Sequence, residues 1–456
     1  MPDAFEKMVS SPAAALEKGV EKSKQITGAI GNQKHLQRAH AYWKTLGPGL
    51  TTGAADDDPS GIATYSQTGA QYGFQLLWLS VFTFPLMSIV QEMCARIGLV
   101  TGRGLAGNIR LYFPRWVLYL CTLLLFGANT LNLGADLGAM AKASQLLFPK
   151  VDFSALVVFF ALLSLALQIF TTYDKYAKYL KWLALVLISY IFSAVSVNLD
   201  WHKLLTAAIV PSITFSKEQI LLICGILGTT ISPYLFFWQT SQEVEEQILE
   251  GKTSLKLRQE ETTTQEVKDM RTDVWSGMFL SNLVMFFIIA AAAVTLFATG
   301  KTNITTAADA AEALKPLAGD QAFLLFTLGI VGTGMLAVPI LAGSASYAIS
   351  EAFGWKSGLY HKLKQAQAFY GVIIISMLIG LLINFIGLDP IKALIYSAVG
   401  NGLIAPLVLA LIVIISSNKK VMGGWVNNPF VTILGWGITL IMLVSGVAAI
   451  YSLFTT

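Results

Sequence analysis

The sequence contains little charge and few cysteines. Only 13% of its 456 residues are charged, whereas about a quarter of the residues in soluble domains carry charge, which excludes an ordinary soluble fold. Cys94, Cys121 and Cys224 form no CxxC pair and have no histidine partner in the sequence. A disulfide framework and the common zinc motifs are therefore excluded, and we interpret these cysteines as small buried hydrophobic residues.

What the sequence does contain is a long series of apolar segments. Hydrophobic residues make up 55% of the chain, and segments of about 20 apolar residues are long enough to cross a bilayer as helices. We predict an all-α polytopic membrane protein with about 11 transmembrane helices. The predicted spans are 46–67, 74–97, 116–140, 153–171, 178–197, 219–242, 273–298, 321–349, 368–386, 391–416 and 430–454.

The distribution of positive charge predicts the orientation of these spans. When each Lys and Arg is assigned to its nearest loop, 24 of the 31 fall on the side of the N-terminus and 7 on the other. Because positive residues accumulate in cytoplasmic loops, we expect a cytoplasmic N-terminus and an external C-terminus. Residues 1–45 lack the features of a signal peptide and are interpreted as a cytoplasmic tail, with the membrane domain at 46–456. The net charge of +4 thus reflects topology and gives no indication of nucleic-acid binding.

Three consecutive aspartates, Asp56, Asp57 and Asp58, lie inside the first predicted span. Ionisable groups at membrane depth cost several kcal/mol and mark functional sites. A proline follows directly at Pro59, and a second midspan proline, Pro233, lies in the sixth predicted span. Proline removes a backbone donor and disfavours helical geometry in the preceding residue, so both helices should be broken at these points.

The two predicted breaks are five spans apart. A unit with an odd number of spans returns inverted when it is repeated, so spans 1–5 and 6–10 form two antiparallel halves. Interrupted helices at corresponding positions of two halves indicate the central site of a transporter. In an extended stretch the three carboxylates can approach one cation. We expect direct or water-mediated contact for Asp58, whereas Asp56 and Asp57 either join it or only line a water-filled vestibule.

Several short motifs resemble the Nramp family of divalent-metal transporters. The similarity is strongest in the first two spans and weaker toward the C-terminus. The motifs are Gly47-Pro48-Gly49, Asp58-Pro59-Ser60-Gly61-Ile62-Ala63-Thr64, Gln67-Thr68-Gly69-Ala70, Leu76-Leu77-Trp78, Ala95-Arg96-Ile97-Gly98-Leu99-Val100-Thr101-Gly102, Asn428-Pro429 and Gly435-Trp436. The resemblance implies a LeuT-type inverted-repeat fold. It also implies a metal held by an aspartate and an asparagine of the first helix, and by a carbonyl and a methionine of the sixth.

When the family's ligands are assigned position by position, this sequence retains only part of the set. The aspartate is Asp58 and the carbonyl belongs to Thr229, but the asparagine position is Gly61 and the methionine position is Ser232. Loss of a thioether favours hard cations, and loss of the asparagine enlarges the cavity for an ion that retains its waters. The pattern therefore resembles the Nramp-related magnesium transporters. We expect transport of magnesium, and of manganese as a second oxygen-preferring ion.

The resemblance also bears on proton coupling. The family's sixth-helix histidine position is Tyr234, the third helix retains Asp136 but has Asn129 and Ala139 beside it, and the ninth-helix arginine aligns with Val372. We therefore expect uncoupled or weakly coupled transport driven by the membrane potential. No imidazole relay is predicted in the membrane, because the four histidines lie outside the predicted spans, at His35, His40, His202 and His361.

Other polar residues near the breaks carry two interpretations each. Gln239, Gln242 and Glu243 either line an ion pathway or end a helix facing cytoplasm, and the stretch 243–273 is interpreted as a solvated helix extension followed by a loop. Polar side chains in the third and tenth spans face the bundle interior or make interhelical hydrogen bonds. These side chains are Asn132 and Asn401.

Competing functions remain for such a chain. A proton-coupled manganese or iron symporter is the main alternative, followed by a receptor-like scaffold with the same membrane domain. An intramembrane aspartyl protease is disfavoured, because Asp136 lacks a Gly-X-Gly-Asp setting. We expect divalent ions as substrate, no resident cofactor, no nucleic-acid partner, a monomer as the default, and residence in a bacterial plasma membrane.

Overall fold

The computed structural model describes residues 42, 45–171, 192, 200–304, 306–315 and 319–454. The chain divides into two units, Met1–Gly47 and Pro48–Thr456. Almost all of the predicted span 178–197 and of the predicted tail 1–45 lies outside the described residues.

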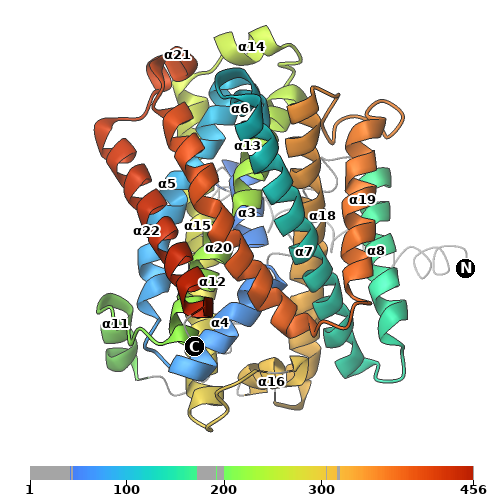
Figure 1. Ribbon diagram of the computed structural model, residues 1–456, viewed down its shortest axis with the longest axis vertical. Coiled ribbons are helices and arrows are strands. Elements are labelled where there is room, and N and C mark those ends of the chain that lie inside the picture. The colour runs from blue at the N-terminus through green and yellow to red at the C-terminus, as the bar shows by residue number, and fades with distance from the viewer. Residues whose placement is uncertain are drawn as a thin grey trace, which may run out of the picture. The chain divides into compact units, whose positions relative to one another are not determined.

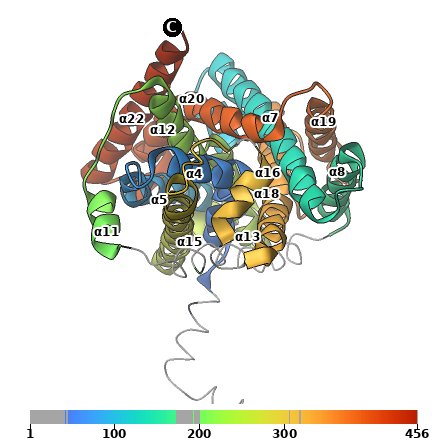
Figure 2. The same cartoon turned by 90° about the horizontal axis from the view of Figure 1, so that it is seen from below.

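Each of the ten other predicted spans is helical, and eight helical segments in the described part of the chain are long and apolar enough to cross a membrane. They enclose a core in which α4 lies near the middle when the molecule is seen from the α16 end (Figure 2). In chain order the spans are α3 (Pro48–Asp56) with α4 (Pro59–Tyr72), α5 (Trp78–Thr101), α7 (Arg115–Leu147), α8 (Phe153–Phe170), α12 (Lys217–Thr230) with α13 (Pro233–Leu249), α15 (Thr264–Ala292) with η2 (Ala293–Phe297), α18 (Ala322–Phe353), α19 (Gln367–Ile383), α20 (Pro390–Ser416) and α22 (Pro429–Phe454).

Short helices connect the spans at the two ends of the bundle. Figure 1 shows α6 (Leu105–Tyr112), α14 (Leu255–Glu260) and α21 (Lys419–Met422) at one end. The opposite end carries α11 (Trp201–Ile209) and α16 (Ala307–Ala311). We refer to these as the α14 end and the α16 end.

Both predicted helix breaks are present, and the same local chemistry makes each. Pro59 and Pro233 are the first residues of α4 and α13. Proline is well tolerated there, because the first helical residues have no intrahelical acceptor for an N–H. The preceding residues, Asp58 and Ser232, are extended, with ψ of 172° and 131°. Each broken span thus consists of two helices that meet in the interior.

The stretch 243–273 contains more helix than loop, and it is buried only at its two ends. Helix α13 continues to Leu249, α14 follows, and a capping box of Thr263 and Glu266 starts α15. Glu243 and Glu245 are both buried. The prediction of a solvated extension is therefore confirmed for residues 249–265, whose side chains are exposed or partly exposed, and is wrong for Glu243 and Glu245, which accept hydrogen bonds from buried donors.

Candidate functional site

Asp58 lies at the break between α3 and α4 and is completely buried. As the N-cap of α4, its Oδ1 accepts from the Gly61 N–H at 2.7 Å and from Ser60 Oγ at 2.6 Å. Its Oδ2 accepts from Asn132 Nδ2 at 2.9 Å, with Tyr234 Oη at 3.5 Å. Helices α4, α7 and α13 therefore converge on one carboxylate, and their donors stabilise its negative charge.

Asn132 belongs to this site, although the sequence does not predict its contact with Asp58. Its interhelical hydrogen bond was predicted, but the acceptor is the Asp58 carboxylate itself. Ser397 of α20 donates to Asn132 Oδ1 at 2.7 Å, which fixes the amide with its N–H toward Asp58. Nothing in the local spacing identifies this partner, because Asn132 and Asp58 are 74 positions apart.

Tyr234 connects the two broken helices. Its hydroxyl donates to the carbonyl of Ala55 at 2.9 Å. That carbonyl lies in the last turn of α3, where carbonyls lack intrahelical partners. A tyrosine at this position therefore ties α13 to the end of α3 and brings its hydroxyl beside the carboxylate.

Ser232 and Thr229 form the α12 side of the break. The Ser232 hydroxyl donates to the carbonyls of Gly228 at 2.6 Å and Thr229 at 2.8 Å. A carbonyl oxygen has two lone pairs, so Thr229 retains one that is not used by this bond. The hydroxyl oxygen of Ser232 likewise keeps its capacity to accept.

Gly61 lies where α4 of the first span packs closely on α12 of the sixth. A Cβ built on it would lie 3.0 Å from the Asp56 carbonyl oxygen, 3.2 Å from Thr229 Oγ1 and 3.3 Å from Tyr65 Cε2. These distances are too short for a side chain unless the neighbours shift. In this conformation, the lack of a side chain at Gly61 therefore allows α4 to pack on α12. It does not leave an enlarged space at this position.

The three aspartates do not gather around one point. Helix α3 continues through Asp56, whose Oδ2 accepts from Ser281 of α15 at 2.7 Å. Both carboxylate oxygens of Asp57, and both of Asp136 in α7, are buried without a hydrogen-bond partner. Within the described ranges no group of three or more His, Cys, Asp or Glu side chains is placed to hold one ion. In this conformation the three carboxylates therefore do not form one common site, because successive residues around a helix end point in different directions.

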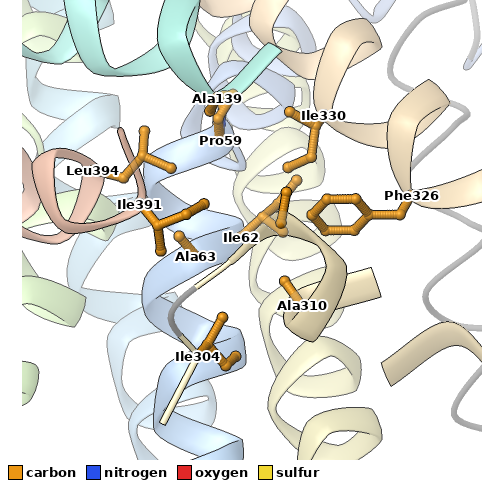
Figure 3. A pocket seen from close by; sticks show the side chains of 11 residues that line it. Pro59, Ile62, Ala63, Ala139, Ile304, Ala310, Phe326, Ile330, Ile391 and Leu394 are labelled. Atoms are coloured by element: carbon orange, nitrogen blue, oxygen red, sulfur yellow. The ribbon is translucent and has the colours of Figure 1, made fainter. Parts of the chain in front are cut away.

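The α16 end of the site is closed by apolar side chains. Ile62 of α4, Phe326 and Ile330 of α18, and Ile391 and Leu394 of α20 surround a cavity of about 10 Å³ beside Pro59 (Figure 3). This volume admits about one water molecule, and the walls offer it almost no polar partner. A hydrated ion cannot pass from this side without movement.

The α14 end is closed by α3. Asp273 of α15 accepts from the Gly49 N–H at 2.6 Å and the Leu50 N–H at 3.0 Å, which anchors the start of α3. On the other side of α3, Thr52 Oγ1 donates to Gln239 Oε1 at 2.5 Å, and Gln239 Nε2 donates to Glu243 at 2.8 Å. The polar face of α13 thus lies against α3 as a buried network. The Asp58 site is therefore closed to solvent at both the α14 end and the α16 end.

Glycines allow α3 and α15 to touch through their backbones. A Cβ on Gly277 would lie 2.1 Å from the Gly49 carbonyl oxygen, and one on Gly53 would lie 2.2 Å from the Gly277 carbonyl oxygen. No side chain fits at such distances from backbone atoms. This contact can form only while these positions remain glycine.

We expect Gly277→Ala to open the α14 end. The added methyl should cost the closed state about 1–3 kcal/mol, or roughly tenfold in its population. The check is the labelling rate of Thr52→Cys by a thiol reagent after Cys94, Cys121 and Cys224 have been replaced by serine. Gly127→Ala is the matched control, since nothing lies within 4 Å of its added Cβ. Equal labelling in the two variants would contradict a glycine-dependent closure.

Comparisons with known proteins agree with this architecture. The family model described as natural resistance-associated macrophage protein-like, or Nramp, matches residues 49–452. The chain belongs to the Nramp family. A divalent metal cation transporter MntH of Klebsiella pneumoniae is 26% identical to it over 403 residues, covering 87% of this chain and 91% of that protein.

Solved structures confirm the predicted LeuT-type fold of this Nramp chain. A crystal structure of the Eremococcus coleocola manganese transporter has a TM-score of 0.71 at 19% identity, covering 91% of this chain and 88% of that chain. A crystal structure of MhsT in complex with L-phenylalanine has a TM-score of 0.55 at 12% identity, covering 89% of this chain and 98% of that chain. At these identities the similarity establishes the fold alone.

Proposed function

We propose that this protein transports divalent cations by alternating access, with magnesium as the main substrate and manganese as a second one. The observation that carries the proposal is the buried Asp58 carboxylate at the meeting point of two broken helices. Two of its relatives support the class of substrate, one named as a divalent metal cation transporter and the other as a manganese transporter. The substrate ion would enter when the apolar closure at the α16 end opens, and leave when α3 moves away from α13 and α15.

The donors around Asp58 favour a hydrated ion. Both carboxylate oxygens already accept hydrogen bonds from the protein. Ser232 supplies a hydroxyl oxygen in place of the family's methionine sulfur, and Thr229 supplies a carbonyl. Magnesium gives up its waters reluctantly and binds through few direct carboxylate contacts, so it suits such a site. Asp57 and Asp56, which lie on either side of the end of α3, would add negative potential without binding the ion directly.

Transport is proposed to be uncoupled from protons or only weakly coupled. Tyr234 replaces the histidine of the family, and its hydroxyl is engaged with the Ala55 carbonyl. The membrane potential alone supplies about 4.6 kcal/mol per 100 mV for a divalent ion, at about 2.3 kcal/mol per charge. With the α14 end in the cytoplasm, a negative interior would therefore drive uptake. We place the protein as a monomer in a bacterial plasma membrane.

The test is ion uptake into proteoliposomes that contain a magnesium-sensitive dye, with a pH dye in a parallel sample and a negative internal potential. We expect magnesium entry that manganese competes for, without acidification of the lumen. Manganese entry with acidification and no magnesium signal would refute the magnesium proposal. Vesicles without protein provide the control for passive leak.

A proton-coupled manganese or iron symporter is the second candidate function. One observation favours it: the buried Asp136 has no hydrogen-bond partner on either carboxylate oxygen, so no donor among the described residues stabilises its charged form. Asp136→Asn distinguishes the two mechanisms. The variant should keep its metal flux under an applied potential if transport is uncoupled, and should lose pH-driven flux if protons are coupled.

A further inference from the structure

A second cavity lies at the α14 end of the molecule, away from Asp58. It has a volume of about 540 Å³ and lies between α6, α13, α14 and α18. Figure 1 shows these helices meeting at that end of the bundle. The size falls within the range of small-molecule sites. Neither the transport mechanism nor the closure by α3 uses it.

Three arginines line this cavity, and none of them forms a close ion pair with a residue that the structure describes, although the Glu351 carboxylate acts on Arg103 at longer range. Arg103 donates no side-chain hydrogen bond and forms no ion pair with any residue that the structure describes. Arg110 makes one long contact, 3.4 Å, with the Glu351 carbonyl. Arg258 donates only to backbone carbonyls, those of Gly102, Lys252 and Thr253. All three guanidinium groups are therefore available to an anion.

The two carboxylates in the wall are held by protein donors. Glu245 accepts from the Tyr347 hydroxyl at 2.5 Å and from the backbone N–H groups of Leu359 and Tyr360 at 2.8 and 3.2 Å. Glu351 accepts from the Gly107 N–H at 2.8 Å. These bonds fix the loops that form the walls. Three guanidinium groups against two such carboxylates leave the cavity with a net positive charge.

Arg103 and Arg258 also repel one another. Burial and the nearby Arg103 charge lower the pKa of the Arg258 guanidinium. Gly354, at a φ of +73°, leaves room for Arg110, whose Nη1 would be 2.1 Å from a Cβ there. A bound anion would stabilise like charges brought together in this way, in addition to the Glu351 carboxylate that acts on Arg103. Guanidinium groups pair with phosphate oxygens in a bidentate geometry, which makes phosphate the best-matched anion.

We propose that this cavity binds a phosphate-bearing anion through Arg103, Arg110 and Arg258. The bound anion links α6 to α14, and thereby holds the segment that follows α13. The phosphate comes either from a soluble molecule in the cytoplasm or from the headgroup of an anionic lipid, and both would contact the same guanidinium groups. A cation leaving Asp58 is repelled by this cavity and follows the path beside α3.

The test compares the purified full-length protein with Arg103→Gln/Arg110→Gln. In the soluble arm, inorganic pyrophosphate is added without divalent metal, and sulfate at equal ionic strength is the control for screening. In the lipid arm, nanodiscs of phosphatidylcholine are compared with nanodiscs that also contain phosphatidylglycerol. The readout in both arms is the midpoint of thermal unfolding. Arg115→Gln is the matched variant, because Arg115 starts α7 near α6 and does not line the cavity.

A soluble ligand is supported if pyrophosphate stabilises the wild type and its apparent affinity falls about tenfold for each arginine removed. The affinity should be unchanged in Arg115→Gln. The same pattern with phosphatidylglycerol supports a lipid headgroup. The proposal is overturned if neither probe stabilises the wild type more than the double variant, or if Arg115→Gln loses the effect equally. Should the double variant not fold, Arg103→Gln carries the test, because this side chain donates no hydrogen bond that folding requires, and Arg103→Lys tests retention of charge.

Discussion

Asp58→Asn should reduce divalent uptake by about 100-fold or more and leave the protein folded. The substitution removes the one fully buried carboxylate that α4, α7 and α13 jointly surround with donors. Loss of one partner from a buried charged site costs about 3–5 kcal/mol, which corresponds to roughly 100-fold or more in binding. An asparagine Oδ1 can still cap α4, so the fold should persist. Uptake in proteoliposomes and the unfolding midpoint of the same preparation are the two measurements.

The hydrogen bond between Asp58 and Asn132 allows a control that separates the loss of the ligand from the loss of stability. In Asp58→Asn the new amide N–H would face the Asn132 N–H, and Asn132 cannot simply flip because Ser397 donates to its oxygen. The exchange Asp58→Asn/Asn132→Asp restores one donor and one acceptor and keeps the net charge. We expect this exchange to recover stability but not transport. Recovery of transport in the exchange variant would mean that only the charge of the cavity matters. Uptake above half the wild-type rate in Asp58→Asn would refute a ligand role for Asp58.

The architecture follows from local chemistry and is therefore readable from the sequence. Apolar length predicts the spans, and Pro59 and Pro233 predict the breaks, because a proline affects its own helix wherever that helix lies. The inverted relation of the halves follows from the odd number of spans, five, in each half. These predictions are confirmed by the helices of the described residues and by the similarity to solved LeuT-type structures.

The details of the site depend on contacts between distant segments and were therefore less predictable. The sequence identifies Asp58 as a buried carboxylate in a break, but not its bond to Asn132. It suggests an open space at Gly61, whereas the structure packs Thr229 and the Asp56 carbonyl close to that position. Only the three-dimensional path of α12 past α4 decides between these outcomes.

Gly61→Asn/Ser232→Met should shift the preference of the protein from magnesium toward manganese and softer metals. The methionine introduces a thioether, which binds transition metals better than magnesium, and the asparagine adds a direct oxygen ligand that displaces retained waters. We expect magnesium uptake to fall by about tenfold or more and cadmium uptake to appear, since about 1.4 kcal/mol of differential binding suffices for a tenfold change. The measurement is uptake of each ion alone and in competition, in the same proteoliposomes.

Packing must be separated from ligand chemistry in this experiment. A Cβ at position 61 would lie 3.0 Å from the Asp56 carbonyl oxygen, and Ser232 is fully buried, so any larger side chains strain the closed conformation. Gly61→Ala/Ser232→Leu introduces the Cβ and nearly the volume of methionine without sulfur or a second amide. This control should lose flux of all ions to a similar degree without a change in preference. If it shifts selectivity as the ligand variant does, cavity shape sets the preference; if neither variant does, Gly61 and Ser232 are not the determinants of ion choice.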